Sequence, residues 1–246
     1  MKNIYFFLSL IVVILFTQCE DSNYTSNDSS DTGTAGSLAR FAISNNYLYT
    51  VELEHLKIFD ITNEAEPVFL KQIYSDFGIE TIFAKDHYLF LGSRWGVYIY
   101  DITIPENPIR LSLFSHIYSC DPVVVSGNYA YATLNSAGVC GRGLNQLSII
   151  DVTDKSNPFE VATVSMESPK GLGVSGNLLF VCDNGIKVFD ISDPLSPVFI
   201  RKETVSAFDV IPIDNILIVV AENGLYEYEF EATGELSLLS TIQSNK

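Results

Sequence analysis

The chain has 246 residues, of which 47% are hydrophobic and 18% are charged. The 30 acidic side chains outnumber 14 basic ones, and the net charge of −16 argues against nucleic acids and anionic lipid headgroups as partners. A content of 15 glycines, 9 prolines, 13 tyrosines and 16 phenylalanines is typical of short strands joined by tight turns. Composition therefore predicts a folded, all-β protein.

The first residues of the chain are predicted to form an export signal. A basic Lys2 precedes an apolar run over residues 5–16, which is too short to span a membrane. Cys19 follows, with two acidic residues directly after it, and this arrangement resembles a bacterial lipoprotein signal. The resemblance implies that residues 1–18 are removed and that Cys19 is acylated, which anchors the protein to the cell outer membrane through its lipid. The alternative is an ordinary cleaved signal in which Cys19 is incidental.

Residues 19–37 are predicted to form a flexible acidic tether. After Cys19, the segment EDSNYTSNDSSDTGTAGS holds one aromatic residue and no aliphatic side chain larger than alanine, so it cannot bury enough surface to fold. Acidic residues directly after a lipidated cysteine are similar to the signal that sends some Gram-negative lipoproteins to the cell surface. We therefore expect a protein that is anchored in the cell outer membrane and exposed at the cell surface.

A repeat of about forty residues occupies the rest of the chain. Four strings share an aspartate, a threonine or serine two places on, and a proline seven places on: IFDITNEAEP, IYDITIPENP, IIDVTDKSNP and VFDISDPLSP. The repeated residues are Asp60, Asp101, Asp151 and Asp190, with Pro67, Pro108, Pro158 and Pro197. A fifth, degenerate copy follows, in which Glu229 takes the aspartate position. These strings resemble the LVIVD repeat family, mostly of unknown function, in which each unit forms one blade of a β-propeller.

Each unit also has the local signature of four short strands. The first turn of every unit holds Asn, Asp or Gly, which tolerate the positive φ needed there. These turns lie at residues 45–46, 86–87, 127–128, 176–177 and 214–215. The repeated aspartate is expected to bond backbone amides after the third strand, and the repeated proline to begin the outer strand. Because these residues recur in every blade, they cannot converge on one ligand, and we interpret them as structural.

The predicted architecture is one all-β domain, residues 38–243, folded as a five-bladed β-propeller with four antiparallel strands in each blade. The four strands of a blade are expected to be contiguous in sequence. A polar tether cannot add a strand to the last blade, so blades one and five are expected to meet mainly through side-chain packing. A four-bladed ring with a detached fifth unit, or a partner that completes the ring, is the alternative.

Candidate binding residues are those that break the repeat on one face. When the four strands alternate in direction, the start of each inner strand and the end of each second strand share a face. Blade three carries an insertion there, within residues 135–146, which is either a binding loop or a tolerated surface loop. Trp95, the only tryptophan, is expected either to bind a sugar or protein partner or to be buried between blades. The candidates are Glu80, Asp121, Lys170, Phe208 and Asp209 near the central channel, then Arg94, Trp95, Arg142 and Asn145 further out.

The cysteines of blade three add a prediction about the same face. Cys120 begins the first strand and Cys140 follows the second, so both fall at one edge. We predict a disulfide between them, which closes a loop of about twenty residues and contributes about 3 kcal/mol to stability. Cys182, within an apolar strand, is predicted to be a buried free thiol.

The sequence favours binding over catalysis. It contains no Gly-rich phosphate loop, nucleophile elbow or CxxC pair, and neither a metal nor another cofactor is expected. The histidines, which lack metal-ligand spacing, are His55, His87 and His116. The leading hypothesis is a non-catalytic lipoprotein whose propeller binds a protein or glycan at the cell envelope. One alternative is a glycoside hydrolase that uses Glu80, Asp121 and Asp209, and another is an architectural component of an envelope assembly.

Overall fold

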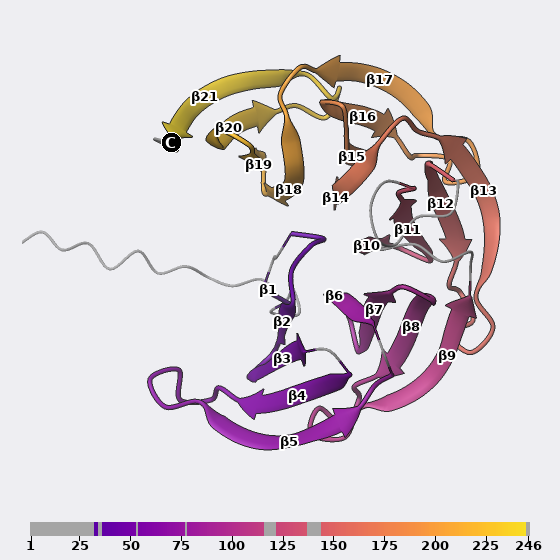
Figure 1. Cartoon of the computed structure of the whole chain (residues 1–246), viewed down its shortest axis with the longest axis vertical. Coiled ribbons are helices and arrows are strands. Elements are labelled where there is room, and N and C mark those ends of the chain that lie inside the picture. The colour runs from indigo at the N-terminus through magenta and orange to yellow at the C-terminus, as the bar shows by residue number, and fades with distance from the viewer. Residues whose placement is uncertain are drawn as a thin grey trace, which may run out of the picture.

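The computed structural model describes residues 32–33, 36–52, 54–76, 78–115, 122–136 and 144–244. Its strands form five antiparallel sheets arranged as blades around a central channel, which confirms the predicted five-bladed propeller (Figure 1). Each blade runs from an inner strand at the channel to an outer strand at the rim. Among the described residues, no helix is long and apolar enough to cross a membrane.

All five blades share one topology, in which strands adjacent in sequence are adjacent in the sheet. Blade one consists of β2 (Phe41–Ser44), β3 (Tyr47–Glu52), β4 (His55–Asp60) and β5 (Val68–Tyr74). Blade two consists of β6 (Ile79–Lys85), β7 (Tyr88–Ser93), β8 (Gly96–Asp101) and β9 (Ile109–Ser115). Blade three consists of β10 (Val123–Ser126), β11 (Tyr129–Leu134), β12 (Gln146–Asp151) and β13 (Phe159–Ser165). Blade four consists of β14 (Pro169–Ser175), β15 (Leu178–Asp183), β16 (Ile186–Asp190) and β17 (Val198–Glu203). Blade five consists of β18 (Ala207–Ile213), β19 (Ile216–Ala221), β20 (Gly224–Phe230) and β21 (Leu236–Gln243).

The two-residue turn between the first and second strands is built as predicted in every blade. Each of these turns begins with a residue in the left-handed region, with φ between 51° and 55°. The five residues are Asn45, Asp86, Gly127, Gly176 and Asp214. Asparagine, aspartate and glycine reach this region at the lowest cost, so each first hairpin is encoded locally. We call the face that carries these turns the hairpin face, and the opposite face, where the inner strands start, the loop face.

The repeated aspartates and prolines are structural, as predicted. Each aspartate ends the third strand and accepts a hydrogen bond from the backbone amide two residues on, at 2.7 to 2.8 Å. Hydrogen bonds from the hydroxyl and amide of that threonine or serine lower the pKa of each of these carboxyl groups. Each proline directly precedes the outer strand, at a position where the sheet needs no hydrogen bond from a backbone N–H. The residues concerned are Asp60, Asp101, Asp151 and Asp190, with Pro67, Pro108, Pro158 and Pro197.

Four apolar clusters hold the blades together, one between each successive pair. Successive side chains of a middle blade belong to different clusters. In blade two, Leu89 and Leu91 lie against blade one, whereas Phe90 lies against blade three. Side chains alternate between the two faces of a strand, so a blade covered on both faces needs a nearly continuous apolar run. This requirement explains the hydrophobic strands of the repeat.

Residues 36–39, which we call the closing segment, connect the two ends of the propeller. Ser37 is 1% exposed, and its Oγ donates a hydrogen bond to Asp209 Oδ1 of blade five at 3.0 Å. The same oxygen accepts a hydrogen bond from the Leu172 amide of blade four at 2.7 Å. The Leu38 amide donates to Asp209 Oδ2 at 3.1 Å. The chain that enters blade one is therefore tied to blades four and five.

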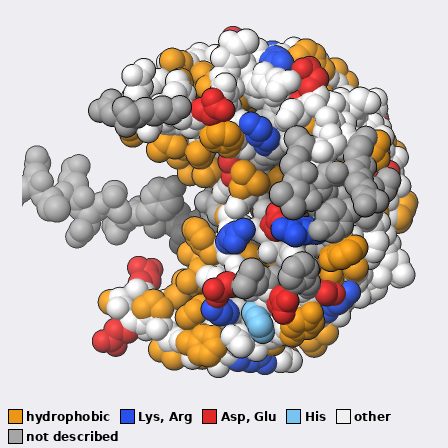
Figure 2. All heavy atoms as spheres, viewed as in Figure 1, with side chains coloured by type: hydrophobic (Ala, Val, Ile, Leu, Met, Phe, Trp, Pro, Cys, Tyr) orange, Lys and Arg blue, Asp and Glu red, His pale blue; other side chains and the backbone are white. Residues whose placement is uncertain are grey.

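The structure corrects two expectations about the ends of the propeller. The described fold begins before the predicted boundary at Leu38, because β1 (Thr32–Gly33) pairs antiparallel with β2 and Ser37 is buried. Blades one and five are joined by hydrogen bonds of the closing segment and not mainly by side-chain packing, and the surface is open between the two end blades (Figure 2). Small polar residues can enter the channel and satisfy polar groups that inner strands leave unpaired. Blade five is not detached, since β18 lies against β14 of blade four.

Candidate functional site

Three of the candidate residues near the channel lie in β-bulges on the loop face. The register of the first hairpin shifts at the start of β6, β14 and β18. A bulge bends the strand and re-aims a side chain, and bulges are over-represented beside binding sites. The residues in these bulges are Glu80, Lys170 and Phe208.

In blade two, an ion pair and a fixed turn present the single tryptophan. Arg94 Nε donates to Glu80 Oε1 at 3.0 Å, and both side chains are more than two-thirds buried. The Trp95 amide donates to Ser93 Oγ at 3.1 Å. Gly96 has φ of 140°, and a Cβ there would lie 1.8 Å from a carbonyl oxygen of β9, so only glycine fits. Trp95 is 47% exposed on this turn, which shows that it is not buried between blades.

In blades four and five, a cation and an aromatic ring lie together beside a groove. Lys170 Nζ lies 4.7 Å from the centre of the Phe208 ring, a cation–π contact, and Phe208 is 36% exposed. Two adjoining grooves on this face share residues 204–206 and Glu222 as their lining, and Lys170 lines one of them. The sequence predicted both aromatic residues on this face, and the structure exposes them.

Asp209 belongs to the closing contact and does not face an open channel. The residue is 7% exposed, and its carboxylate accepts the hydrogen bonds from Ser37 and Leu38 described above. Burial raises the pKa of this carboxyl group, although the hydrogen bonds from the closing segment oppose that effect. A ligand can contact the group only if the closing segment is displaced.

The Asn145 side chain links neighbouring segments of the loop face through hydrogen bonds. Its Oδ1 accepts hydrogen bonds from the Ser136 amide at 2.8 Å and Ser136 Oγ at 2.9 Å, and its Nδ2 donates to the Glu167 carbonyl at 2.6 Å. It therefore holds the chain on both sides of the blade-three insertion and ties it to the start of blade four. The remaining site predictions lie outside the described residues: Cys19, Cys120, Asp121, Cys140 and Arg142.

The end of β15 carries a buried carboxylate that sequence reasoning missed. Asp183 is fully buried and accepts hydrogen bonds from Lys187 Nζ at 2.6 Å, the Ser168 amide at 2.5 Å and the Glu167 amide. Burial raises its pKa, but these hydrogen bonds outweigh it and leave the pKa below the usual value. The preceding residue, Cys182, is a buried free thiol, as predicted. Within the part of the chain that the structure describes, no group of three or more His, Cys, Asp or Glu side chains could hold a metal ion.

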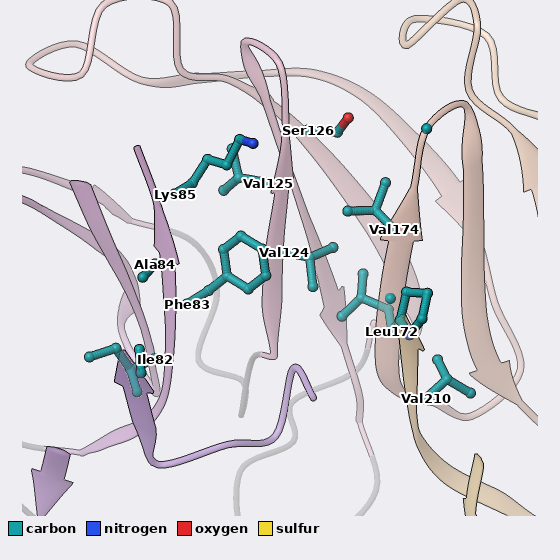
Figure 3. Close-up of a pocket in the computed structure, with 14 residues that line it drawn as sticks. Ile82, Phe83, Ala84, Lys85, Val124, Val125, Ser126, Leu172, Val174 and Val210 are labelled. Carbon is teal, nitrogen blue, oxygen red and sulfur yellow. The ribbon is translucent and has the colours of Figure 1, made fainter. Parts of the chain in front are cut away.

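A cavity of about 240 Å³ lies in the central channel toward the hairpin face. All five inner strands contribute to its lining (Figure 3). Lys85 is the one charged residue of that lining, and Phe83 is its largest side chain. Sequence reasoning concentrated on the loop face and did not predict this cavity.

The sequence pattern of the LVIVD repeat matches residues 35–76, 119–165 and 169–203, which together make half of the chain. The chain belongs to the LVIVD repeat family. The matched LVIVD segments correspond to blades one, three and four. A comparison with curated protein sequences found no significant match.

Solved structures agree with the propeller fold of these LVIVD repeats. A protein from Lactobacillus plantarum is 17% identical with a TM-score of 0.63, over 80% of this chain and 67% of that one. The periplasmic gluconolactonase of Pseudomonas aeruginosa is 12% identical with a TM-score of 0.62, over 89% and 79% of the two chains. A chain of the mitotic checkpoint complex is 15% identical with a TM-score of 0.58, over 82% and 64%. At these identities the likeness shows the fold alone.

Proposed function

We propose that the protein is a non-catalytic binding platform at the cell envelope, anchored to the membrane through lipid on Cys19, whose loop face holds a protein partner. The observation that carries this proposal is the exposure of Trp95 on a turn that the structure fixes. The exposed Phe208, which makes a cation–π contact with Lys170, lies on the same face of the propeller.

Exposed aromatic residues on rigid turns are the side chains from which strong protein contacts are built. Tryptophan, tyrosine and arginine are enriched among residues whose truncation costs an interface 2 kcal/mol or more. The Gly96 turn and the Glu80–Arg94 ion pair hold the backbone beside Trp95, so little conformational freedom is lost when a partner covers the ring. The checkpoint-complex chain with the same fold is, by the name of its structure, part of a protein assembly.

A glycoside hydrolase is less well supported by the contacts of its candidate carboxylates. Glu80 is paired with Arg94, and Asp209 is held by Ser37 within the closing contact. An acid–base pair needs two carboxylates that face one open site. The third candidate, Asp121, lies outside the described residues. The gluconolactonase shares the fold at 12% identity, which carries no activity to this chain.

The proposal is tested by crosslinking in envelope fractions. A photoreactive group placed beside Trp95 should give a discrete crosslinked protein, and the Trp95→Ala/Phe208→Ala double variant should reduce its recovery by about tenfold or more. The matched control is Phe159→Ala, which removes an aromatic ring that is even more exposed, at 57%, from outer strand β13. Equal loss in the control, or equal recovery in all three proteins, would contradict the loop-face site.

Anchoring is tested separately by metabolic labelling with radioactive palmitate. The full chain should incorporate label, and Cys19→Ser should abolish it and release the protein into the soluble envelope fraction. Unchanged labelling in Cys19→Ser would show that the lipid is not attached there. Because the two tests use different readouts, the anchor and the loop-face site can fail independently.

A further inference from the structure

The channel cavity lies toward the hairpin face, and the closing segment crosses the channel on its loop-face side. The closing segment crosses the channel between inner strands: the Ala39 carbonyl accepts a hydrogen bond from the Ile82 amide of β6, and Ser37 contacts Leu172 of β14. Ile82 and Leu172 also line the cavity, so the closing segment borders it on the loop-face side. The closing segment therefore crosses the axis next to the loop-face end of the cavity.

The pocket has a polar rim and an apolar floor. Figure 3 shows Lys85 and Ser126 at one end, Phe83 opposite Val124 in the middle, and Val210 at the far end. The Val124 and Val210 side chains are almost completely buried in the clusters between blades, at 2% and 0% exposure, whereas Phe83 is partly exposed. A ligand that fits this distribution has one polar or charged end and a short apolar chain.

Lys85, at the rim of the pocket, departs from the residue type that the repeat has at this position. The residue before the first turn is serine in blades one, three and four and isoleucine in blade five, and it is lysine only in blade two. A residue that serves the fold of each blade recurs in each blade, whereas a residue that serves a shared central ligand needs to occur once. The single ammonium group makes the rim suitable for one negative charge.

Backbone amides add hydrogen-bond donors to the same site. The Ile82 and Leu172 amides point toward the axis, since each donates to the closing segment there. Backbone groups of a strand alternate in direction with a period of two, so the Ala84 and Val174 amides point the same way, into the cavity. Both residues line the cavity on unpaired edges of their blades. The carbonyl oxygens of these residues point the same way as their amides, so the backbone edge offers both donors and acceptors, and Lys85 supplies the positive charge.

We propose that the channel cavity binds a small monocarboxylate with a short apolar chain, whose carboxylate meets Lys85 and Ser126 and whose chain contacts Phe83. The cavity volume of about 240 Å³ corresponds to about eight water-sized groups at roughly 30 Å³ each. A six-carbon fatty acid anion has that number of non-hydrogen atoms. This site lies on the opposite side of the closing segment from the proposed protein-binding face and does not depend on that proposal.

The test is a titration of the purified protein with hexanoate, followed by calorimetry and by NMR. Binding should saturate, and hexanamide, which has the same shape without the charge, should bind at least tenfold more weakly. Lys85→Met should weaken hexanoate binding by tenfold or more and remove the preference over hexanamide. Lys202→Met is the matched control, since it removes an exposed lysine from the outer strand β17, and it should leave binding unchanged.

Two further observations locate the ligand. In the wild-type protein, nuclear Overhauser contacts should join the hexanoate methyl group to the Phe83 ring, which needs no variant at all. Val174→Phe should fill the cavity and abolish binding while the protein stays folded. Absence of saturation, equal affinity for hexanamide, unchanged affinity in Lys85→Met, or contacts away from Phe83 would each overturn the proposal.

Discussion

Replacing Ser37 with alanine should weaken the whole propeller, although this residue lies ahead of the first blade. The substitution removes a hydrogen bond to a buried carboxylate at 3.0 Å and one from the Leu172 amide at 2.7 Å. Ser37 is 1% exposed, so water cannot replace either bond without a rearrangement. A net hydrogen bond contributes about 1 kcal/mol and one to a charged group about 1.5 to 3 kcal/mol, so the free energy of unfolding should fall by about 2 to 4 kcal/mol.

The assay is urea unfolding of a double-mutant cycle that combines Ser37→Ala with Asp209→Ala. If the two side chains act through their contact, the double variant should lose less than the sum of the single losses, with a coupling of about 1 kcal/mol or more. Hydrogen exchange should become faster in β18 and in the closing segment before it changes in blade two. Additivity within about 0.5 kcal/mol, or a cost of Ser37→Ala below that value, would refute the reasoning.

The other predictions concern buried groups. Gly36→Ala should destabilise the protein by about 1 to 3 kcal/mol, because its Cβ would lie 2.1 Å from Asp209 Oδ2. In urea unfolding, Asp209→Ala should relieve that cost, and equal costs of Gly36→Ala with and without Asp209 would contradict this explanation. Asp183 has a lowered pKa, so its stabilising contribution should be present above about pH 4 and disappear as the pH falls through the folded pKa. The free energies of unfolding of the wild-type protein and Asp183→Asn should therefore converge in acid, and parallel pH profiles would exclude this. Asp209 has a raised pKa, so its contribution should have the opposite sign, present below about pH 4 and lost as the pH rises through the folded pKa, and Asp209→Asn should flatten that part of the profile. Burial raises the pKa of the Cys182 thiol, so a thiol reagent should label it only as fast as the protein unfolds, and rapid labelling of the native protein would argue against its burial.

The features predicted well from the sequence are those that a few neighbouring residues determine. Asn45, Asp86 and Asp214 adopt positive φ because their turns need it, and Asp101 bonds an amide two residues away. Such contacts depend on residue type and local spacing, which the repeat displays several times over. The blade count followed from the same local pattern.

The closing segment could not be predicted in this way, because its contacts join residues far apart. Ser37 and Asp209 are separated by 172 positions, and nothing near either residue specifies the other. Ser37 also lies in a stretch whose composition is typical of a disordered tether. Ser37 is nevertheless ordered, because its hydroxyl group bonds an amide and a carboxylate that would otherwise be buried without partners.

The open junction between the end blades did leave a signal in the sequence. In the third strand of blade one, Lys57 takes the position of Tyr98, whose side chain lies in the cluster between blades one and two. In blade five, Glu227 takes the position of Ile99, which lies in the cluster between blades two and three. Each end blade thus carries a charge on the face that has no neighbouring blade. Terminal repeats of an array need such polar outer faces, so these two substitutions indicate a ring that is not closed by a fifth apolar cluster.

The closing segment gives the channel two unlike ends, and this separates the two proposed sites. On the loop face, Ser37 and Asp209 block the axis, so a partner there meets the bulges and the exposed Trp95. On the hairpin face, the axis stays open to the cavity beneath Lys85. Displacing the closing segment would join the two ends into one pore, lined by an uncovered Asp209 carboxylate that repels anions. Ser37→Ala should therefore weaken hexanoate binding in addition to lowering stability, whereas Trp95→Ala should leave it unchanged; the reverse pattern would show that the cavity and the closing segment are independent.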